Sequence, residues 1–248
     1  AGDSSVKKQV LAYLKSTYNI EEKDLVSAEL RLTPALKPKD VGFDRSLVAA
    51  YGHDDKVAAY ASVRAILDMK GGQYTSMSFL VDNEEVGNVN NTGAESSYLT
   101  DLMSELIYQQ DPKNYNDIVA KKAFAKTQFI STDVNPGVNP GWPGVWELGN
   151  APKLGYGINI KLYGGGFNAN SEMIAETRKY LDDSGIPWQT STYKGRASGG
   201  TIGNDISARN MNVIDFGVPI LSIHSPYAVA AKGDIYALYQ SMKAFFNH

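Results

Sequence analysis

The sequence has 248 residues, with 24 basic against 27 acidic side chains and a formal net charge of −3 at pH 7. This near balance argues against a nucleic-acid partner, which needs a strongly basic face, and 43% hydrophobic residues argue against intrinsic disorder. The absence of cysteine excludes disulfides, thiolate metal ligands and a cysteine nucleophile. No membrane-length apolar run or signal-peptide core is present, so we expect a cytoplasmic protein with no membrane partner.

Helical and strand patterns alternate along the chain. Apolar residues at helical spacing predict helices over residues 6–18, 54–67, 97–108, 172–181, 201–209 and 234–246. Short apolar or alternating stretches predict strands over residues 26–32, 76–81, 128–131, 157–162, 188–193, 213–216 and 219–223, and the glycine run Gly164–Gly166 predicts a loop. Strands that alternate with helices are typical of a layered α/β fold with a mostly parallel sheet.

Acidic side chains and one histidine follow the predicted strands. Glu84 and Glu85 come after the strand that ends at residue 81, Asp133 after the strand that ends at residue 131, and His224 after the strand that ends at residue 223, while Asp54 opens a predicted helix. In α/β sheets the carboxyl ends of strands carry ligand sites. Adjacent glutamates there repel each other unless a divalent cation neutralises them. One of the pair can then bind metal while the other accepts a proton from water.

Each of these residues also has an ordinary structural interpretation, which the pattern leaves open. Glu84 and Glu85 can form a solvated acidic turn, and Asp54 can cap a helix. Asp133 precedes Asn-Pro and can form a turn, and His224 can be a core histidine. The chain has no GxSxG elbow for a serine hydrolase and no P-loop lysine.

Five motifs occur in order along the chain: YGHDD from Tyr51, VDNEEVGNVNNTGAES from Val81, STDVNP from Ser131, GGTIG from Gly199 and DFGVPILSIHSP from Asp215. Together they resemble the aspartyl aminopeptidase family of co-catalytic dizinc aminopeptidases, over nearly the whole chain. The resemblance implies a three-layer α/β/α catalytic domain. It also implies a metal-dependent aminopeptidase that removes N-terminal residues, including acidic ones, from peptide substrates.

The resemblance also assigns roles to single positions. Asp54 matches the aspartate that bridges the two metals, Glu84 the general base, and Glu85 and His224 ligands of one metal. Asp133 matches a ligand of the other metal. Lys161 matches a lysine that faces the substrate carboxylate, although a surface lysine at a strand end explains it equally well. The family implies two zinc ions, and the donor set also suits cobalt or manganese.

One family feature is missing from these 248 residues, namely the N-terminal segment whose HxD motif supplies the first metal-binding histidine. Residues 1–43 resemble the end of an inserted dimerisation domain, and residues 44–248 resemble the C-terminal part of the catalytic domain. The site with Asp133 then keeps few ligands. We therefore also consider a catalytically incomplete fragment or a non-catalytic assembly module, with the missing N-terminal segment supplied by the same gene product. The family implies a homo-oligomer.

Overall fold

The computed structural model describes residues 3–164, 167–195 and 199–248. Gly165 and Gly166, in the loop predicted from the glycine run, lie outside the described residues. The chain forms two compact units, residues 1–35 and residues 36–248. No helix in the described part of the chain has the length and apolar character needed to cross a membrane.

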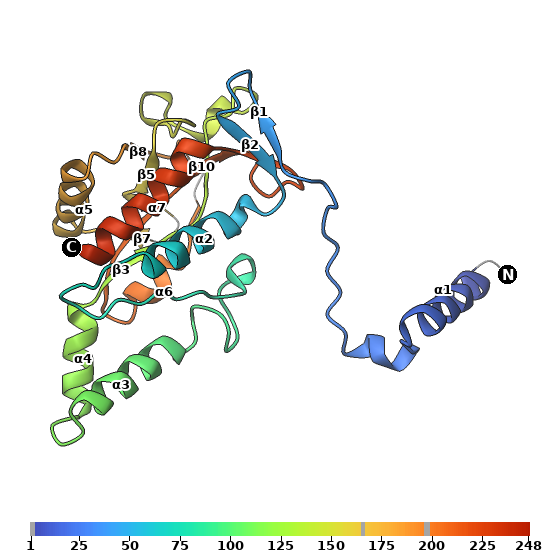
Figure 1. Ribbon diagram of the computed structural model, residues 1–248, viewed down its shortest axis with the longest axis horizontal. Helices are drawn as coiled ribbons and strands as arrows, with labels where there is room; N and C mark the ends of the chain where they lie inside the picture. The colour runs from blue at the N-terminus through green and yellow to red at the C-terminus, as the bar shows by residue number, and fades with distance from the viewer. Residues whose placement is uncertain (1–2, 165–166, 196–198) are drawn as a thin grey trace. The chain divides into compact units, whose positions relative to one another are not determined.

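The first unit contains the helix α1 (Asp3–Tyr18) and a 3-10 helix, η1 (Glu22–Val26). The predicted helix over residues 6–18 is confirmed. The predicted strand over residues 26–32 is wrong, because this segment forms no strand and its apolar side chains Val26, Leu30 and Leu32 are exposed. Alternating apolar and polar residues are typical of a strand with one buried face. Such a segment becomes a strand only where a neighbouring segment supplies hydrogen bonds. Figure 1 shows α1 in dark blue.

The second unit is built on mixed β-sheets. A five-stranded sheet has the order β1-β2-β11-β10-β4, a four-stranded sheet has the order β3-β9-β5-β8, and β6 pairs with β7. Parallel pairing joins β3 to β9, β5 to β8 and β4 to β10, and antiparallel pairs join the rest. The α/β class is therefore confirmed. The strands are β1 (Lys39–Val41), β2 (Leu47–Ala50), β3 (Gln128–Ser131), β4 (Asn135–Pro136), β5 (Ile158–Lys161), β6 (Tyr163–Gly164), β7 (Phe167–Asn168), β8 (Trp188–Ser191), β9 (Asn212–Gly217), β10 (Pro219–Leu221) and β11 (Ala228–Ala231).

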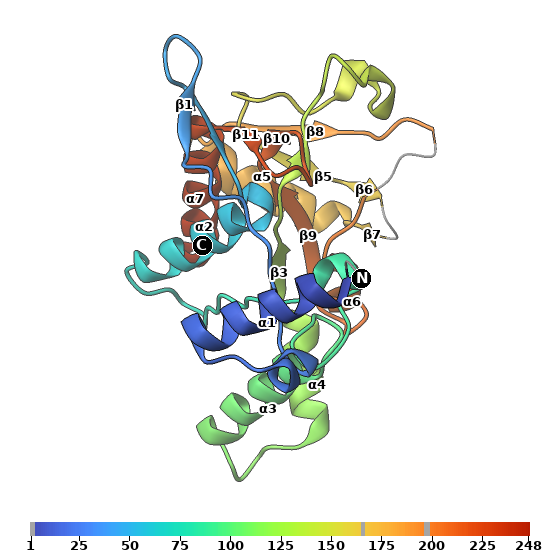
Figure 2. The ribbon, with the colours of Figure 1, turned by 90° about the vertical axis from the view of Figure 1, so that its right-hand side faces the viewer.

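Helices pack on these sheets. They are α2 (His53–Leu67), α3 (Tyr98–Gln110), α4 (Asp117–Lys126), α5 (Ser171–Asp183), α6 (Gly203–Ser207) and α7 (Lys232–Asn247), with short 3-10 helices η2 (Glu84–Val86), η3 (Pro143–Val145) and η4 (Leu148–Asn150). α2 and α7 contact each other closely (Figures 1 and 2). Ala58, Ala61 and Ala65 of α2 are fully buried at helical spacing. Small side chains at these positions let neighbouring elements of the core approach α2 closely.

The two faces of the four-stranded sheet differ in polarity. Ile158 and Ile160 of β5 and Ile214 and Phe216 of β9 are fully buried and belong to one hydrophobic core. Burying each such side chain contributes about 1.5–3 kcal/mol. Side chains alternate across a strand, so the residues between these positions lie on the opposite face. That face carries buried polar residues, among them Lys161, and α6 contacts β3 and β9.

The predicted strand over residues 76–81 is wrong, because the segment joins no sheet among the described residues. Its β-forming composition is real, but no neighbouring strand pairs with it. Met77, Phe79 and Val81 instead pack in part against the hydrophobic core and line a cavity. The segment leads directly into η2, which carries the two glutamates, so it still positions the candidate site.

Candidate functional site

Asp54, Glu85 and His224 come together from three separate parts of the chain. His224 Nε2 lies 3.3 Å from Asp54 Oδ2 and 3.2 Å from Glu85 Oε1. One ligand atom from each residue lies within 4.8 Å of the others, which makes this a group that could hold a metal ion. Asp54 is mostly buried, whereas Glu85 and His224 each expose 63% of their side chains. The cluster therefore opens to solvent on one side.

The geometry of this cluster suits zinc. Two ligand atoms that each lie about 2.1 Å from zinc at the tetrahedral angle are about 3.4 Å apart. The separations of His224 Nε2 from the Glu85 and Asp54 oxygens, 3.2 and 3.3 Å, are close to that value. One imidazole nitrogen and two carboxylate oxygens are also ligands that zinc accepts, and three protein ligands are typical of a catalytic site with one open position. The residues present therefore fit a zinc ion.

The backbone around the cluster is held in specific conformations. Asp54 has non-helical dihedral angles (φ −91°, ψ 110°) although it lies in the first turn of α2. η2 is flanked by two left-handed residues, Asn83 (φ 62°) and Gly87 (φ 95°), and His224 is itself left-handed (φ 61°). Glycine adopts this region most readily, and asparagine and histidine do so more often than other side chains. The residue types at these three positions therefore suit the backbone conformation that the site requires.

Hydrogen bonds hold the loop that carries the glutamates. Asn83 Nδ2 donates to the carbonyl oxygen of Val89 at 3.1 Å and to Thr92 Oγ1 at 3.0 Å. Asn88 Nδ2 donates to Asp205 Oδ2 of α6 at 2.8 Å, so the loop is tied to the helix on the polar side of the sheet. A Cβ on Gly93 would lie 2.0 Å from the Asn88 carbonyl oxygen, so the loop closes only with glycine there. Hydrogen bonds and close packing thus position the loop that carries Glu84 and Glu85.

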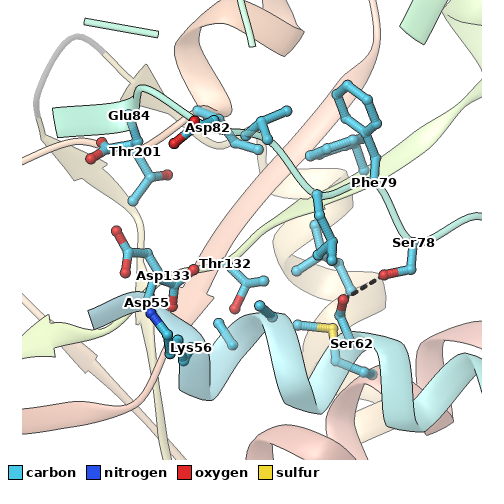
Figure 3. A pocket seen from close by; sticks show the side chains of 18 of the residues that line it. Asp55, Lys56, Ser62, Ser78, Phe79, Asp82, Glu84, Thr132, Asp133 and Thr201 are labelled. Atoms are coloured by element: carbon cyan, nitrogen blue, oxygen red, sulfur yellow. Dashed lines mark hydrogen bonds between the residues drawn. The ribbon is translucent and has the colours of Figure 1, made fainter. Parts of the chain in front are cut away.

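Glu84 lies beside the cluster but is not one of its three members. The side chain is half-buried, and burial raises the pKa of its carboxyl group. The nearby carboxylates of Glu85 and Asp54 raise this pKa further, while Lys161 and His224 oppose the shift. Figure 3 shows Glu84 and Thr201 on one side of the pocket and Asp133 and Asp55 opposite them. A carboxylate with a raised pKa beside a metal-binding group is suited to accept a proton.

Asp133 lies outside the group of three and pairs with Asp55. Burial, followed by the charge of Asp54, raises the pKa of Asp133 to about 7. Burial, the charge of Asp133 and a hydrogen bond with it raise the pKa of Asp55 to about 10. Two buried carboxyl groups side by side cannot both be charged at low cost, so they share a proton or bind a cation. The sequence pattern did not indicate this pairing of Asp55 with Asp133.

Lys161 is buried, with 7% of its surface exposed, so the interpretation as a surface lysine is wrong. Its Nζ lies 3.6 Å from Asp215 Oδ2. Its positive charge also opposes the rise in the pKa of Glu84 and of Asp133, which places the ammonium within electrostatic reach of both groups. His53 is not a member of the cluster, and its Nε2 lies 3.1 Å from the Val48 carbonyl oxygen.

A cavity of about 570 Å³ adjoins the site. α2 and the segment before η2 line it, together with β3 and the end of α7. Asp54, Glu84, Glu85 and Asp133 are among its lining residues. Its volume is in the range of small-molecule pockets, and apolar walls with a few polar groups at one end are typical of such sites.

Comparison with known proteins identifies the family. A family model described as "Aminopeptidase I zinc metalloprotease (M18)" matches residues 1–246. The chain belongs to the M18 family. A probable M18 family aminopeptidase 1 from Borrelia garinii subsp. bavariensis is 39% identical over 251 residues, an alignment that covers 98% of this chain and 55% of that protein. A probable M18 family aminopeptidase 1 from Clostridium acetobutylicum is 38% identical over 251 residues, which covers 98% of this chain and 54% of that protein.

Solved M18 structures have the same fold. The crystal structure of an M18-family aminopeptidase from Thermotoga maritima matches with a TM-score of 0.92 and 35% identity, over 97% of this chain and 55% of that one. That of aminopeptidase I from Clostridium acetobutylicum matches with a TM-score of 0.87 and 36% identity, over 96% of this chain and 53% of that one. The chain spans about half the length of the M18 relatives it matches.

Proposed function

We propose that this M18 chain carries the metal-binding and proton-transfer groups of a metal-dependent aminopeptidase that removes N-terminal residues from peptides. The observation that carries the proposal is the cluster of Asp54, Glu85 and His224, with Glu84 next to it. His224 lies 3.3 Å from Asp54 and 3.2 Å from Glu85, separations that suit ligands of one zinc ion. The open side of the cluster leaves room for a substrate carbonyl group.

In the proposed mechanism each residue has a separate task. Zinc, when bound, polarises the scissile carbonyl group and makes a water molecule more acidic. Asp54, Glu85 and His224 hold the ion. Glu84 accepts a proton from the attacking water and then donates it to the leaving amine nitrogen. Its raised pKa supports this role, because a base whose pKa lies nearer the working pH both accepts and returns a proton readily.

We also propose a second cation position between Asp54 and Asp133. The raised pKa of Asp133 supports it, since a buried carboxyl group near another carboxylate gains most from a neutralising ion. The described residues offer this position fewer ligands than the first, so we expect weaker binding there. Zinc is the ion that the family description names, and cobalt or manganese would suit the same donors. Lys161 is the proposed recognition group for acidic N-terminal residues.

The test compares Glu84→Gln with Glu105→Gln, an exposed glutamate on α3 that serves as the matched control. We expect Glu84→Gln to keep zinc binding, because Glu84 is not in the cluster, and to lose about 10²- to 10⁴-fold in hydrolysis of an aminoacyl chromogenic substrate. Glu105→Gln should behave like the unchanged chain. Near-normal turnover in Glu84→Gln would show that the base assignment is wrong.

A non-catalytic assembly module is the second candidate, and the small ligand set around Asp133 favours it. We propose that residues 1–43 are the end of an inserted dimerisation domain, that residues 44–248 belong to the catalytic domain, and that the chain forms a homo-oligomer. The exposed apolar side chains Val26, Leu30 and Leu32 support association, because such surfaces bind partners. About one equivalent of zinc without hydrolysis would favour the module, whereas two equivalents with hydrolysis would favour the enzyme. Light scattering measures the oligomer.

A further inference from the structure

Three polar side chains form a row across the polar face of the four-stranded sheet. Ser131 of β3 lies opposite Asp215 of β9, and Asp215 lies opposite Lys161 of β5. Residues in register across neighbouring strands point to the same face of the sheet, so the three side chains are adjacent. Their exposed fractions are 0%, 2% and 7%. A buried aspartate and a buried lysine are rare unless they are paired.

Thr201 closes this row from outside the sheet. Its Oγ1 donates to Asp215 Oδ2 at 2.8 Å, and its hydroxyl also contacts the hydroxyl of Ser131. Thr201 belongs to the GGTIG motif, and Asp215 begins the motif that also contains His224, so the contact joins two residues for which the proposed mechanism has no task. Thr201 also lines the cavity beside the metal-binding cluster. The network therefore connects the sheet to the wall of the candidate site.

The ion pair between Lys161 and Asp215 is longer than a hydrogen bond. The separation of 3.6 Å between Nζ and Oδ2 exceeds the 2.7–3.2 Å or so of a normal N–H···O hydrogen bond. Asp215 Oδ2 is occupied by Thr201, while Asp215 Oδ1 is buried without a hydrogen-bond partner among the described residues. Asp215 thus balances the charge of the ammonium group without using all of its N–H donors. No hydrogen bond joins the remaining donors to another residue of the described ranges, so they are available to an anion.

The electrostatics agree with this geometry. Burial alone lowers the pKa of Lys161, but Asp215 and Asp133 outweigh burial, and the pKa is raised overall. A buried lysine without such a partner tends to lose its proton. Asp215 therefore keeps the ammonium charged in a place where water cannot solvate it. The positive charge of Lys161 lowers the pKa of Glu84 and of Asp133, so it acts on groups of the candidate site.

We propose that Asp215 and Thr201 are positioning residues that hold the Lys161 ammonium group ready to bind the anionic side chain of an acidic N-terminal residue. The proposal rests on the proposed function, because it deepens the substrate preference of the same site. It assigns to Asp215 a favourable effect on anion binding that acts through Lys161. Simple repulsion between Asp215 and an acidic substrate would have the opposite effect.

Binding of free L-glutamate and L-glutamine to the zinc-loaded chain tests the proposal by calorimetry, and the two probes differ in charge but hardly in shape. A charge-assisted hydrogen bond contributes about 1.5–3 kcal/mol, so the unchanged chain should bind glutamate about 10-fold more tightly or better. Lys161→Met should bring the ratio of the two dissociation constants close to 1. Asp215→Asn should do nearly the same, and the double variant should lose nothing further.

The threonine variants keep the test decisive if Asp215→Asn does not fold. Thr201→Val should reduce the ratio several-fold, and Thr201→Ser, which keeps the hydroxyl, should restore it. Asp234→Asn and Thr177→Val are matched controls, because both replace buried residues outside the row and should leave the ratio unchanged. Melting curves show whether each variant is folded. A ratio that is unchanged or higher in Asp215→Asn and unchanged in Thr201→Val would overturn the proposal, as would equal binding of both probes by the unchanged chain.

The calorimetric test is independent of turnover. A chain that discriminates glutamate from glutamine as described but never hydrolyses an aminoacyl substrate would contradict the proposed function and support this inference. A chain that hydrolyses such substrates but gives the same ratio in all variants would contradict this inference alone.

Discussion

Gly217 provides the sharpest structural test of how the site is built. It is the last residue of β9, and a Cβ atom there would lie 1.5 Å from the carbonyl oxygen of Asp133 and 2.7 Å from its carbonyl carbon. Real Cβ atoms essentially never approach another heavy atom within 3.0 Å, which is twice the first distance. The blocking atoms belong to the backbone and cannot rotate away. Gly217→Ala must therefore displace either β9 or the segment that carries Asp133.

The cost follows from overpacking in a closely packed region. Extra atoms in a packed core typically cost about 1–3 kcal/mol, and more where backbone must move, so we expect a loss of about 3 kcal/mol in the free energy of unfolding. Gly233→Ala is the control, because nothing lies within 4 Å of its added Cβ and alanine favours a helix by about 1 kcal/mol over glycine. Urea denaturation followed by circular dichroism measures both variants. A Gly217→Ala variant within about 0.5 kcal/mol of the unchanged chain, the range of neutral surface substitutions, would refute this reasoning.

Two further predictions concern buried charges outside the metal-binding cluster. Asp234 accepts the backbone N–H groups of Gly155 and Gly157, each at 2.7 Å, so Asp234→Asn leaves one of them unpaired and should lower the free energy of unfolding by about 1–3 kcal/mol. The exposed control Asp183→Asn should change it by less than about 0.5 kcal/mol, and equal effects would contradict the prediction. Burial lowers the pKa of Lys161, but neighbouring carboxylates raise it above its ordinary 10.5, so its protonated form favours the folded state. Lys161 also lowers the pKa of Asp133, which is about 7, so the advantage of the unchanged chain over Lys161→Met in unfolding free energy should not fall between pH 7 and pH 9. It should fall only above the ordinary pKa of lysine, and a fall near neutral pH would contradict this.

Much of the helical structure could be predicted from the sequence, because its apolar periodicity is strong. The helix over 54–67 and the strand over 128–131 match α2 and β3 closely. The strands β2 and β11 were missed, since LVAA and AVAA are too short and too rich in alanine to be distinctive. They are strands because they pair with each other, and β11 also pairs with β10. Residues 76–81 have a composition typical of strands, but no other described segment pairs with them, so they form no strand.

Contacts within the candidate site were as hard to predict from local sequence as the strand pairing. The position of Asp54, Glu85 and His224 near element ends predicted that they would converge, and they do lie together. No local pattern could indicate that Thr201 would donate to Asp215, or that Lys161 would be buried next to it, because these contacts depend on strand register. Both motifs that contain Thr201 and Asp215 were visible in the sequence, but the task of these two residues was not. Register decides which polar residues meet across a sheet.

The position of a bound zinc ion tests the central claim most directly. Crystals of the chain grown with zinc, measured on both sides of the zinc absorption edge, locate the ion independently of any activity. We expect an anomalous peak about 2.0–2.2 Å from ligand atoms of Asp54, Glu85 and His224, with Glu84 beside the ion and not bound to it. A zinc ion bound elsewhere on the chain, with these three side chains free of metal, would contradict the account.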